Sequence, residues 1–524
     1  MSVEFNQEHL DTLTEISNQA STYANQERCL YASMPLMQDI QMKNEELGKD
    51  HSDVLASKGK LALMCNTQGN WMESELFQKQ ITEAAARSLD KQRLDTLTYM
   101  DNLALTFENQ GRWRESEKLF VQVMEMRKKV LGQEHPHTLA SMCNLALTYR
   151  GQGRWKEAEK LFVQVMETSN SALGQEHPDT LTCKANLALT FENLGRWRES
   201  EELLVQVMVM RKKVLGQEHP HTLISMGNLA LTYISQGRWK EAEKLFVQVI
   251  ETSKGVLGQE HPDTLICMNN LASTFKNQGR WTEAEKLFVQ VIETRKRVLG
   301  QEHPHTLISM SNLASTFENQ GRWTEAQKLF MQVMETSKRV LGQEHSDTLI
   351  YMNNLASTFK NQGRWTEAEK LVMQVIETRK RVLGQEHPHT LISMSNLAST
   401  FENQGRWTEA EKLFVQVMEA SKRVLGQEHP DTLASMSNLA LIYMNQGRWG
   451  EAEELQIQVI NRMRTTLGKD HPSTVVAIAN LASLHKNREA PRRLSDEDNE
   501  TDEELPQRVL IMSMEDDNDQ EDIG

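Results

Sequence analysis

The stretch N-L-A-S-T-F-E-N-Q-G-R-W-T-E-A-E-K-L-F-V-Q-V at residues 396–417 decides the fold, because close variants of it recur along most of the chain. Its tryptophan returns every 42 residues, with no insertion or deletion anywhere. A fixed period of this length is the signature of a repeat array. The ten tryptophans that mark the period are Trp71, Trp113, Trp155, Trp197, Trp239, Trp281, Trp323, Trp365, Trp407 and Trp449.

Helix-breaking residues are confined to two places in each period. One glycine lies two residues before each tryptophan, and another lies in a loop that reads L-G-Q-E-H-P in most repeats. These two positions hold 20 of the 26 glycines, which leaves two uninterrupted stretches in each repeat. The pattern therefore predicts a helix–turn–helix unit.

The repeat at residues 299–340 shows how the two helices are expected to run. The first covers residues 306–319, and its apolar residues are spaced three or four apart on one face: Leu307, Met310, Ala314 and Phe317. The second covers residues 323–340. Pro304 suits the first turn of a helix, and Gly342 suits a C-terminal cap. Because no sustained period-two alternation or hairpin turn is present, the expected fold class is all-α.

The repeat frame divides the chain into four segments. Residues 1–88 hold two degenerate repeats, with Glu27 and Cys29 at the Gly and Trp positions of the first and Lys60 at an Asn position of the second. Residues 89–466 hold nine regular repeats, and residues 467–485 form a C-terminal capping helix. Atypical end repeats are expected because a terminal unit faces water on one side. A longer period of 84 residues is also visible, since H-P-H-T-L alternates with H-P-D-T-L or H-S-D-T-L.

The motif at residues 396–417 resembles the tetratricopeptide repeat (TPR) consensus. Ala398 follows Leu397, an aromatic residue comes three positions later, Gly and Trp form the turn, and Ala and Phe follow in the second helix. The 42-residue length and the L-G-x-E-H-P-D-T linker resemble the kinesin light chain type of this repeat. The resemblance covers residues 5–485. It implies a right-handed superhelical solenoid of about eleven repeats plus a capping helix, with the first helices lining a concave groove.

An asparagine recurs on the first helix, beside the strongest apolar stripe. In the family that the chain resembles, Asn at the matching position contacts the backbone of a bound peptide, and an amide offers both a donor and an acceptor. A hydrogen bond between repeats is the alternative role, and both can hold together. The candidate groove residues are Asn102, Asn144, Asn186, Asn228, Asn270, Asn312, Asn354, Asn396, Asn438 and Asn480.

The neighbours of these asparagines indicate the chemistry of the groove. Three residues after the Asn, the chain has Leu in the N-terminal repeats and Ser within residues 257–424. Six residues after it, Glu alternates with Lys or Arg in most repeats. We therefore expect an extended peptide of mixed charge as the partner.

The E-H-P-H clusters raise the question of a metal site. A metal needs three or four converging ligands, whereas one loop offers two imidazoles around a proline. Histidines of successive repeats are separated by two helix widths, about 16–20 Å at 8–10 Å per packed helix. We therefore expect no metal, and histidines that cap or buttress the turn between repeats. The tryptophans, at a fixed helical phase beside Ala and Phe, are expected to pack between the two helices of a repeat.

Composition excludes several classes of function. The formal net charge of −15 argues against a general nucleic-acid binder. No apolar run approaches the length of a membrane span. The five cysteines show no C-x-x-C pairing, which fits a reducing, cytoplasmic compartment. No catalytic constellation breaks the repeat, so we expect neither enzyme activity nor a cofactor.

The preferred function is a non-catalytic scaffold or adaptor for protein or peptide partners. One alternative is a kinesin-type cargo adaptor that binds a kinesin heavy chain. Kinesin light chains carry a heptad region for that contact, and no sustained heptads precede the repeats here. Another alternative is the sensor module of a nucleotide-binding, receptor-like protein, although the chain has no G-x-x-x-x-G-K-[ST] loop.

Residues 486–524 have a different composition. They hold 14 acidic and five basic residues, a net charge of −9, and are expected to be disordered. Ser495 and Thr501 lie in sequences that resemble kinase sites. Residues 509–512 resemble a SUMO-interacting motif, and a short apolar segment that folds back on the array is the preferred interpretation.

Overall fold

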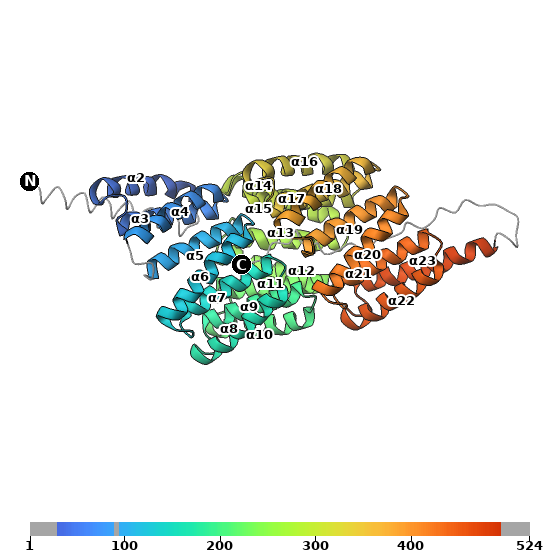
Figure 1. Cartoon of the computed structure of the whole chain (residues 1–524), viewed down its shortest axis with the longest axis horizontal. Coiled ribbons are helices and arrows are strands. Elements are labelled where there is room, and N and C mark those ends of the chain that lie inside the picture. The colour runs from blue at the N-terminus through green and yellow to red at the C-terminus, as the bar shows by residue number, and fades with distance from the viewer. Residues whose placement is uncertain (1–28, 89–93, 494–524) are drawn as a thin grey trace, which may run out of the picture. The chain divides into compact units, whose positions relative to one another are not determined.

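The computed structural model describes residues 29–88 and 94–493. Within these ranges the chain is helical apart from short turns, and the helices follow one another in pairs (Figure 1). This confirms the predicted all-α repeat array. The helices are α2 (Cys29–Leu47), α3 (Ser52–Thr67), α4 (Trp71–Ser88), α5 (Leu94–Asn109), α6 (Trp113–Leu131), α7 (Pro136–Gly151), α8 (Trp155–Ala172), α9 (Pro178–Asn193), α10 (Trp197–Leu215), α11 (Pro220–Ser235), α12 (Trp239–Val256), α13 (Pro262–Asn277), α14 (Trp281–Val298), α15 (Pro304–Asn319), α16 (Trp323–Val340), α17 (Ser346–Asn361), α18 (Trp365–Val382), α19 (Pro388–Asn403), α20 (Trp407–Val424), α21 (Pro430–Asn445), α22 (Trp449–Thr466) and α23 (Pro472–Arg493).

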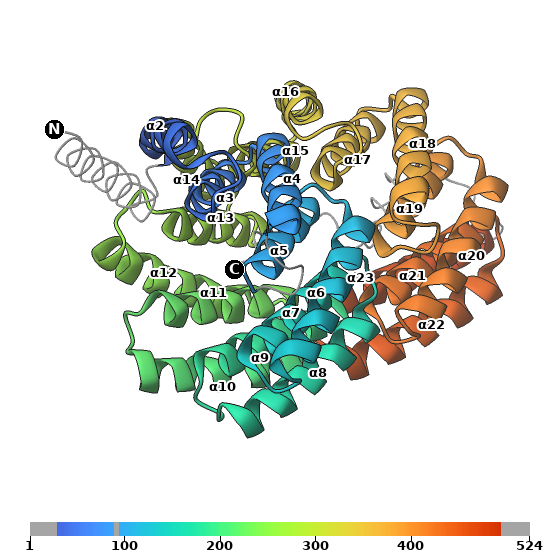
Figure 2. The same cartoon turned by 60° about the vertical axis from the view of Figure 1, so that its left-hand side comes forward.

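The chain divides into two compact units, residues 1–187 and residues 188–524, with the boundary inside α9. Within each unit, helices that are consecutive in the chain pack side by side (Figures 1 and 2). First helices of neighbouring repeats also touch, as α11 and α13 do. Each repeat therefore buries its apolar faces against the repeats before and after it, as expected of a quasi-one-dimensional array.

The turn between the two helices of a repeat is a glycine-dependent helix cap. At the end of α13, the Arg280 N–H donates to the Phe275 carbonyl at 2.9 Å and the Gly279 N–H donates to the Lys276 carbonyl at 3.0 Å. This pair of bonds is a Schellman motif, which needs a residue in the left-handed region. Gly279 supplies it with φ of +75°. The recurrent G-R-W sequence therefore ends one helix and starts the next.

The loop between repeats is closed by side chains of the L-G-Q-E-H-P-x-T sequence. His303 precedes Pro304, the first residue of α15, and its Nδ1 accepts the backbone N–H of His305 at 3.2 Å. The Thr306 hydroxyl donates to the Gly300 carbonyl at 2.9 Å. The same histidine cap begins the first helix at His51, His135, His177, His219, His261, His345, His387, His429 and His471. The predicted capping role of these histidines is therefore confirmed.

The core repeats with the sequence. Ala314 of α15 and Ala326 and Phe330 of α16 are fully buried in one cluster. Some second helices have Ser at the position of Ala326. The hydroxyl of that Ser then lies beside a side chain of the next repeat. Ser74 lies 3.2 Å from the Thr106 hydroxyl in this way. Small residues at these positions let adjacent helices approach closely, so the Ala and Ser positions set the spacing of the array.

The 84-residue period has a physical basis in a buried arginine. Arg295 of α14 donates through Nη1 to the His305 carbonyl and to the Ser309 hydroxyl, each at 2.7 Å. A buried guanidinium needs such acceptors, because desolvating an unpaired charge is costly. The equivalent arginines are Arg127, Arg211 and Arg379. In the alternate repeats the position holds a buried serine, such as Ser337, so arginine and serine repeats alternate.

The closing helix is longer than the sequence indicated. The predicted boundary at residue 485 falls inside α23, which continues to Arg493. His485 and Arg488 both reach Glu453 of α22, at 2.9 and 2.8 Å, and so hold the added turn against the array. At the other end, the first helix of the first degenerate repeat would lie within residues 1–28, outside the described residues.

Phe330→Ala should lower the free energy of unfolding by about 3–5 kcal/mol, because it leaves a cavity among buried side chains. Met331 is the matched control, since it is the next residue and its side chain is 38% exposed. Urea unfolding followed by circular dichroism measures both variants. A cost for Phe330→Ala as small as that for Met331→Ala would contradict the described core.

Candidate functional site

The asparagine ladder lies on the first helices at one position per repeat, but its members differ in exposure. Asn102, Asn144, Asn186 and Asn396 are partly exposed. The other six, Asn228, Asn270, Asn312, Asn354, Asn438 and Asn480, are buried. Contact with a peptide backbone stays a prediction for the ladder, and only the partly exposed members offer surface for it in this structure.

The backbone of the ladder has a role within each helix. The Thr106 hydroxyl donates to the Asn102 carbonyl at 3.0 Å, and the Thr148 hydroxyl donates to the Asn144 carbonyl at 3.0 Å. The same bond recurs at Asn228, Asn270, Asn312, Asn354 and Asn396. These threonines are buried, and the bond gives each of their hydroxyls an acceptor inside the array.

The charged position six residues after the asparagine links neighbouring repeats. Glu192 accepts hydrogen bonds from the hydroxyls of Thr232 and Ser235, at 3.1 and 2.7 Å. Glu402 accepts from the Asn445 amide at 2.8 Å. The alternating charges noted in the sequence therefore serve contacts between repeats, at least at these two positions.

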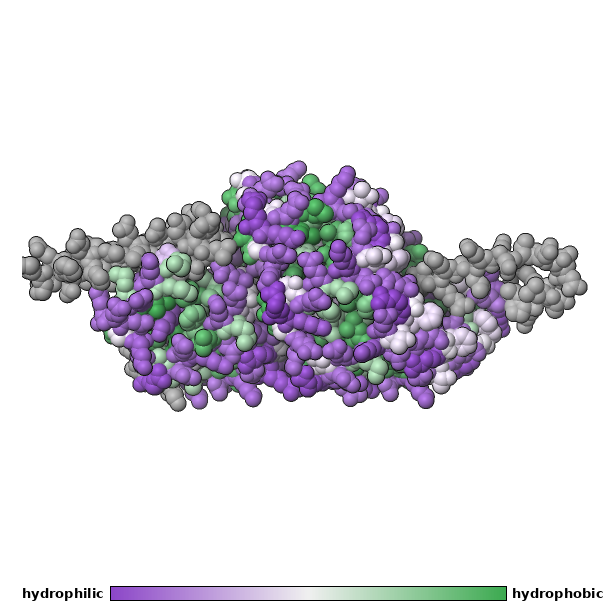
Figure 3. Space-filling view, turned by 90° about the horizontal axis from the view of Figure 1, so that it is seen from above, coloured by the Kyte–Doolittle hydropathy of each residue, from purple (hydrophilic) through white to green (hydrophobic). Residues whose placement is uncertain are grey.

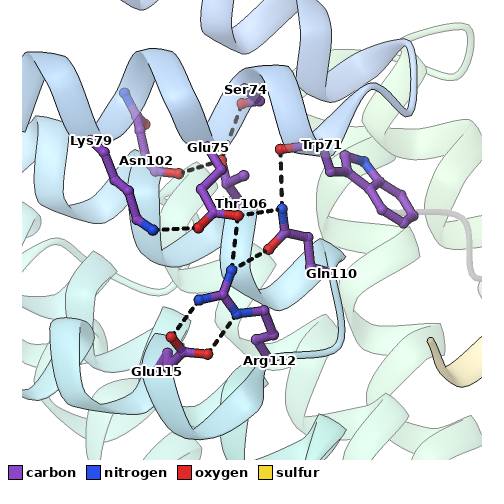
Figure 4. Close-up of polar contacts among 9 residues, drawn as sticks. All are labelled: Trp71, Ser74, Glu75, Lys79, Asn102, Thr106, Gln110, Arg112 and Glu115. Carbon is purple, nitrogen blue, oxygen red and sulfur yellow. Dashed lines mark hydrogen bonds and ion pairs between the residues drawn. The ribbon is translucent and has the colours of Figure 1, made fainter. Parts of the chain in front are cut away.

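Within each unit, a second polar network joins G-R-W turns to the repeat before them. In Figure 4, Arg112 lies between Glu75 of the preceding second helix and Glu115 of its own second helix. Its Nη1 donates to Glu75 at 2.8 Å and to the Gln110 side chain at 2.9 Å. Gln110 in turn donates to the Trp71 carbonyl at 3.1 Å. One guanidinium thus ties two repeats together.

This junction recurs with little change along the array. The guanidinium also stacks on the aromatic residue five positions earlier, at 4.2 Å from the Phe107 ring centre in the first regular repeat. The arginine pairs with a glutamate 37 residues earlier at Arg154, Arg238, Arg280, Arg322, Arg406 and Arg448. Sequence reasoning missed this network, although the fixed spacing of Glu, Gln and Arg was a visible signal.

The junction holds its glutamate ionised. Burial raises the pKa of Glu75, but hydrogen bonds from Lys79, Arg112 and Gln110 outweigh that effect and bring the pKa down to about 2. The Glu115 carboxylate also has a lowered pKa, chiefly because Arg112 donates hydrogen bonds to it. Favourable charge pairing of this kind is a structural arrangement and supplies no acid or base near neutral pH.

Two carboxyl groups on α5 behave in the opposite way. Burial raises the pKa of Asp101 to about 6 although Arg127 lies 2.5 Å away. Burial raises the pKa of Glu108 to about 7, and the charge of Arg150 opposes the shift. Glu108 lies six residues after Asn102, at the charged position that links neighbouring repeats elsewhere in the array. Its protonation therefore bears on the stability of the array.

The tryptophans begin the second helices and differ in exposure. The Trp113 ring lies against Gly151 of the following repeat, where an added Cβ would approach it to 2.4 Å. Trp197 is buried, whereas Trp281 and Trp365 are each 39% exposed. A tryptophan therefore packs against the next repeat as well as within its own, which the sequence did not indicate.

The surface is mainly hydrophilic with separate apolar patches, as the face in Figure 3 shows. One exposed apolar residue recurs at the same position of successive second helices, at Val247, Val289, Met331 and Met373. Single exposed side chains of this kind are ordinary for a soluble surface and carry no functional assignment.

Other candidate sites are limited. Within the described residues, no group of three His, Cys, Asp or Glu side chains could hold a metal ion. None of the described helices is long and apolar enough to cross a membrane. The predicted phosphorylation sites Ser495 and Thr501, and the segment at 509–512, lie outside the described residues.

Stacked helix pairs joined by recurrent polar junctions define a helical-repeat protein. Models of the tetratricopeptide repeat family match residues 53–129, 101–171, 137–213, 179–254, 222–293, 264–339, 305–381, 347–423 and 391–443, and a further one matches residues 432–473. The chain belongs to the tetratricopeptide repeat family. This fold is typically a non-catalytic protein-interaction scaffold, and proteins of the family bind protein or peptide partners.

Several solved structures are similar to parts of the chain. One is of nearly identical TPR-like repeats of a kinesin light chain-like protein of Podosopora anserina, 35% identical over 39% of this chain and 98% of that one, with a TM-score of 0.34. Another is BtubC from P. vanneervenii, 16% identical over 45% and 94%, with a TM-score of 0.36. A Rap protein bound to Competence and Sporulation Factor is 11% identical over 72% and 99%, with a TM-score of 0.47. A comparison with curated proteins found no match.

Glu108→Gln should flatten the pH dependence of stability. Because the pKa of Glu108 is raised on folding, its contribution is complete below about pH 4.5 and is lost as pH rises through about 7. The wild-type chain should therefore lose about 1–3 kcal/mol more than the variant between pH 5 and pH 8. Urea unfolding at both pH values measures the difference. Identical losses would contradict the burial of Glu108, and Glu134→Gln at an exposed loop position should keep the wild-type profile.

Gln327→Glu should stabilise the array. Arg364 meets Gln327 at 3.0 Å, where the other junction arginines named above meet a glutamate. The new carboxylate would complete an ion pair, and the thermal midpoint should rise by about 1–3 °C. Gln343→Glu, at an exposed loop position, is the control. Calorimetry showing no difference between the two variants would mean that the junction charge contributes nothing.

Proposed function

We propose that the chain is a non-catalytic, cytoplasmic scaffold that binds an extended segment of a partner protein along the first helices of residues 94–193. The observation that supports this is the placement of Asn102, Asn144 and Asn186. They occupy one position on three consecutive first helices, α5, α7 and α9, and all three are partly exposed. A row of amides in fixed register can donate to and accept from successive peptide groups of an extended chain.

The surroundings of this row suit a segment with apolar and charged side chains. Leu105 and Leu147 lie three residues after the first two asparagines and are partly exposed. Arg150 lies six residues after Asn144 and is also partly exposed. Apolar side chains of the partner can pack on the leucines, while an acidic side chain can pair with Arg150.

The cysteines support the cytoplasmic location in the proposal. None of Cys65, Cys143, Cys183 and Cys267 takes part in a disulfide bond. Burial and the charge of Glu73 raise the pKa of Cys65 to about 11, so this thiol is an unreactive core side chain. Cysteines outside disulfide bonds are usual in the cytoplasm, where disulfides are rare.

The buried asparagines fit the alternative role that the sequence left open. Asn270 and Asn312 are fully buried on α13 and α15. Such side chains offer no surface to a bound peptide. The proposed binding row is therefore restricted to the partly exposed asparagines of residues 94–193.

The test is selection of peptides from a displayed random library on the immobilised full chain, followed by fluorescence anisotropy with the recovered peptides. The variant Asn102→Ala, Asn144→Ala, Asn186→Ala should bind at least about ten-fold more weakly, because each amide contributes about 1 kcal/mol or more. The matched control is Asn319→Ala, Asn361→Ala, Asn403→Ala, which changes exposed asparagines at the ends of first helices.

Circular dichroism should show the same helical signal for both triple variants, which separates loss of binding from loss of fold. Unchanged affinity of the ladder variant would contradict the proposal. Equal weakening by both triple variants would do so as well, because it would place the peptide outside the ladder.

A further inference from the structure

Two loops of the chain dock onto two G-R-W turns that lie far from them in sequence, all within residues 188–493. The ring of His429 lies with Nε2 3.0 Å from the Asn193 carbonyl at the end of α9. His471 lies with Nε2 3.0 Å from the Ser235 carbonyl at the end of α11. Each pair is separated by 236 residues. The array therefore makes the same kind of loop-to-turn contact with itself at two places.

The contact is close and specific. A Cβ on Gly195 would lie 2.4 Å from Cδ of Pro430, and one on Gly237 would lie 2.5 Å from Cδ of Pro472. The Trp197 ring, in the turn at Gly195, stacks on the His471 ring of the other docked loop at a centre-to-centre distance of 5.4 Å. The glycine of the turn is thus needed for the approach of proline as well as for the helix cap. We call each G-R-W turn with the last carbonyl of its first helix a seat.

The histidine makes two directional contacts at once. Nδ1 of His429 accepts the backbone N–H of Asp431 at 3.1 Å, as the helix cap requires. Nε2 therefore carries the proton and donates it to the Asn193 carbonyl, one of the carbonyls that a helix end leaves without an intrahelical partner. The neutral imidazole is held in one tautomer by the cap, so the loop is preorganised for the seat.

Equivalent seats at Gly279 and Gly363 are open toward solvent. No described atom lies within 4 Å of a Cβ placed on either glycine, in contrast to Gly195 and Gly237. Trp281 and Trp365 are each 39% exposed, whereas Trp197 is 6% exposed. Hollows of about 500 and about 380 Å³ lie beside them.

The open seats have the same backbone conformation at the glycine as the occupied ones. The φ values of Gly279 and Gly363 are +75° and +76°, against +69° at Gly195. The sequence N-x-G-R-W is also shared by residues 193–197, 277–281 and 361–365. An open seat therefore presents the carbonyl and the glycine that the docked loops contact, beside a tryptophan at the position of Trp197.

A loop that matches the docked one is exposed elsewhere in the chain. Residues 173–181 and residues 425–433 have the same sequence, L-G-Q-E-H-P-D-T-L. The side chain of His177 is 38% exposed, against 2% for His429, and Pro178 and Asp179 are exposed. His177 Nδ1 already accepts the Asp179 N–H at 3.2 Å, so this loop has the same cap as the docked one.

We propose that the open seats at Trp281 and Trp365 bind the loop at residues 173–181 of a second copy of this chain. His177 of that copy donates from Nε2 to the carbonyl of Asn277 or Asn361, and Pro178 packs on the glycine. The surface continues the loop-to-turn interface that the chain makes with itself. Because loop and seat are different patches, the contact is heterologous, and each bound copy presents a further free seat and loop. The proposal is independent of the peptide-binding function above.

The test uses the full-length chain with a photoreactive benzoylphenylalanine in place of Thr366, an exposed residue that lines the hollow at Trp365. Irradiation should give intermolecular adducts, and mass spectrometry should map them to residues 173–181. His177→Asn keeps a good helix cap but removes the ring that reaches the seat. This change should lower the yield of intermolecular adduct at least about ten-fold.

The matched control places the same probe at Arg198, the equivalent exposed position of an occupied seat. Its adducts should be intramolecular, to the loops at His429 or His471. Sedimentation velocity should show a mass that rises with concentration for the wild-type chain and less so for His177→Asn. A chain that stays monomeric, intermolecular adducts to other regions, or an adduct yield unchanged by His177→Asn would each overturn the proposal.

Discussion

Within each of the two units, a guanidinium group at the turn of a regular repeat holds that repeat to its predecessor. Arg280 illustrates the arrangement, since it donates to Glu243 of the preceding second helix and to Glu283 of its own second helix. It also stacks on Phe275, with the guanidinium 4.1 Å from the ring centre. A repeat of two helices cannot bury its apolar faces alone. The junction fixes how the next pair of helices is placed, and the core clusters follow from that placement.

Single residues in the loops and turns also serve two contacts at once. One histidine caps the first helix through Nδ1, and at His429 and His471 it also reaches a distant carbonyl through Nε2. One glycine ends the first helix, and at Gly195 and Gly237 it admits a proline that any side chain would exclude. Local caps and long-range contacts therefore depend on the same short motifs, which is a physical reason for their recurrence along the chain.

Much of the fold could be predicted from the sequence because its signals are local and repeated. The expected second helix at 323–340 coincides with α16, and the first helix ends at Asn319 as expected. The capping role of the loop histidines also followed from their place before a helix. The burial of Arg295 could not be predicted in this way, because a charged side chain is normally expected at the surface. Only the structure shows that Arg295 donates to the Ser309 hydroxyl and the His305 carbonyl inside the array.

The candidate site was less predictable. The sequence shows one asparagine per repeat but not that Asn102 reaches the surface while Asn312 is buried. Exposure depends on the packing around each helix, which near-identical repeats do not encode individually. The contact between His429 and Asn193 could not be foreseen either. This contact depends on the small rotation between each repeat and the next, added up over the intervening repeats. No local sequence pattern indicates the total rotation.

The most direct test of the central claim is a double-mutant cycle between Glu243 and Arg280 in the full chain, with each residue changed to Ala singly and together. Urea unfolding gives the coupling free energy between the two side chains. If the guanidinium junction joins repeats, the coupling should be about 1 kcal/mol in favour of the pair. Additive effects, with a coupling indistinguishable from zero, would contradict the account.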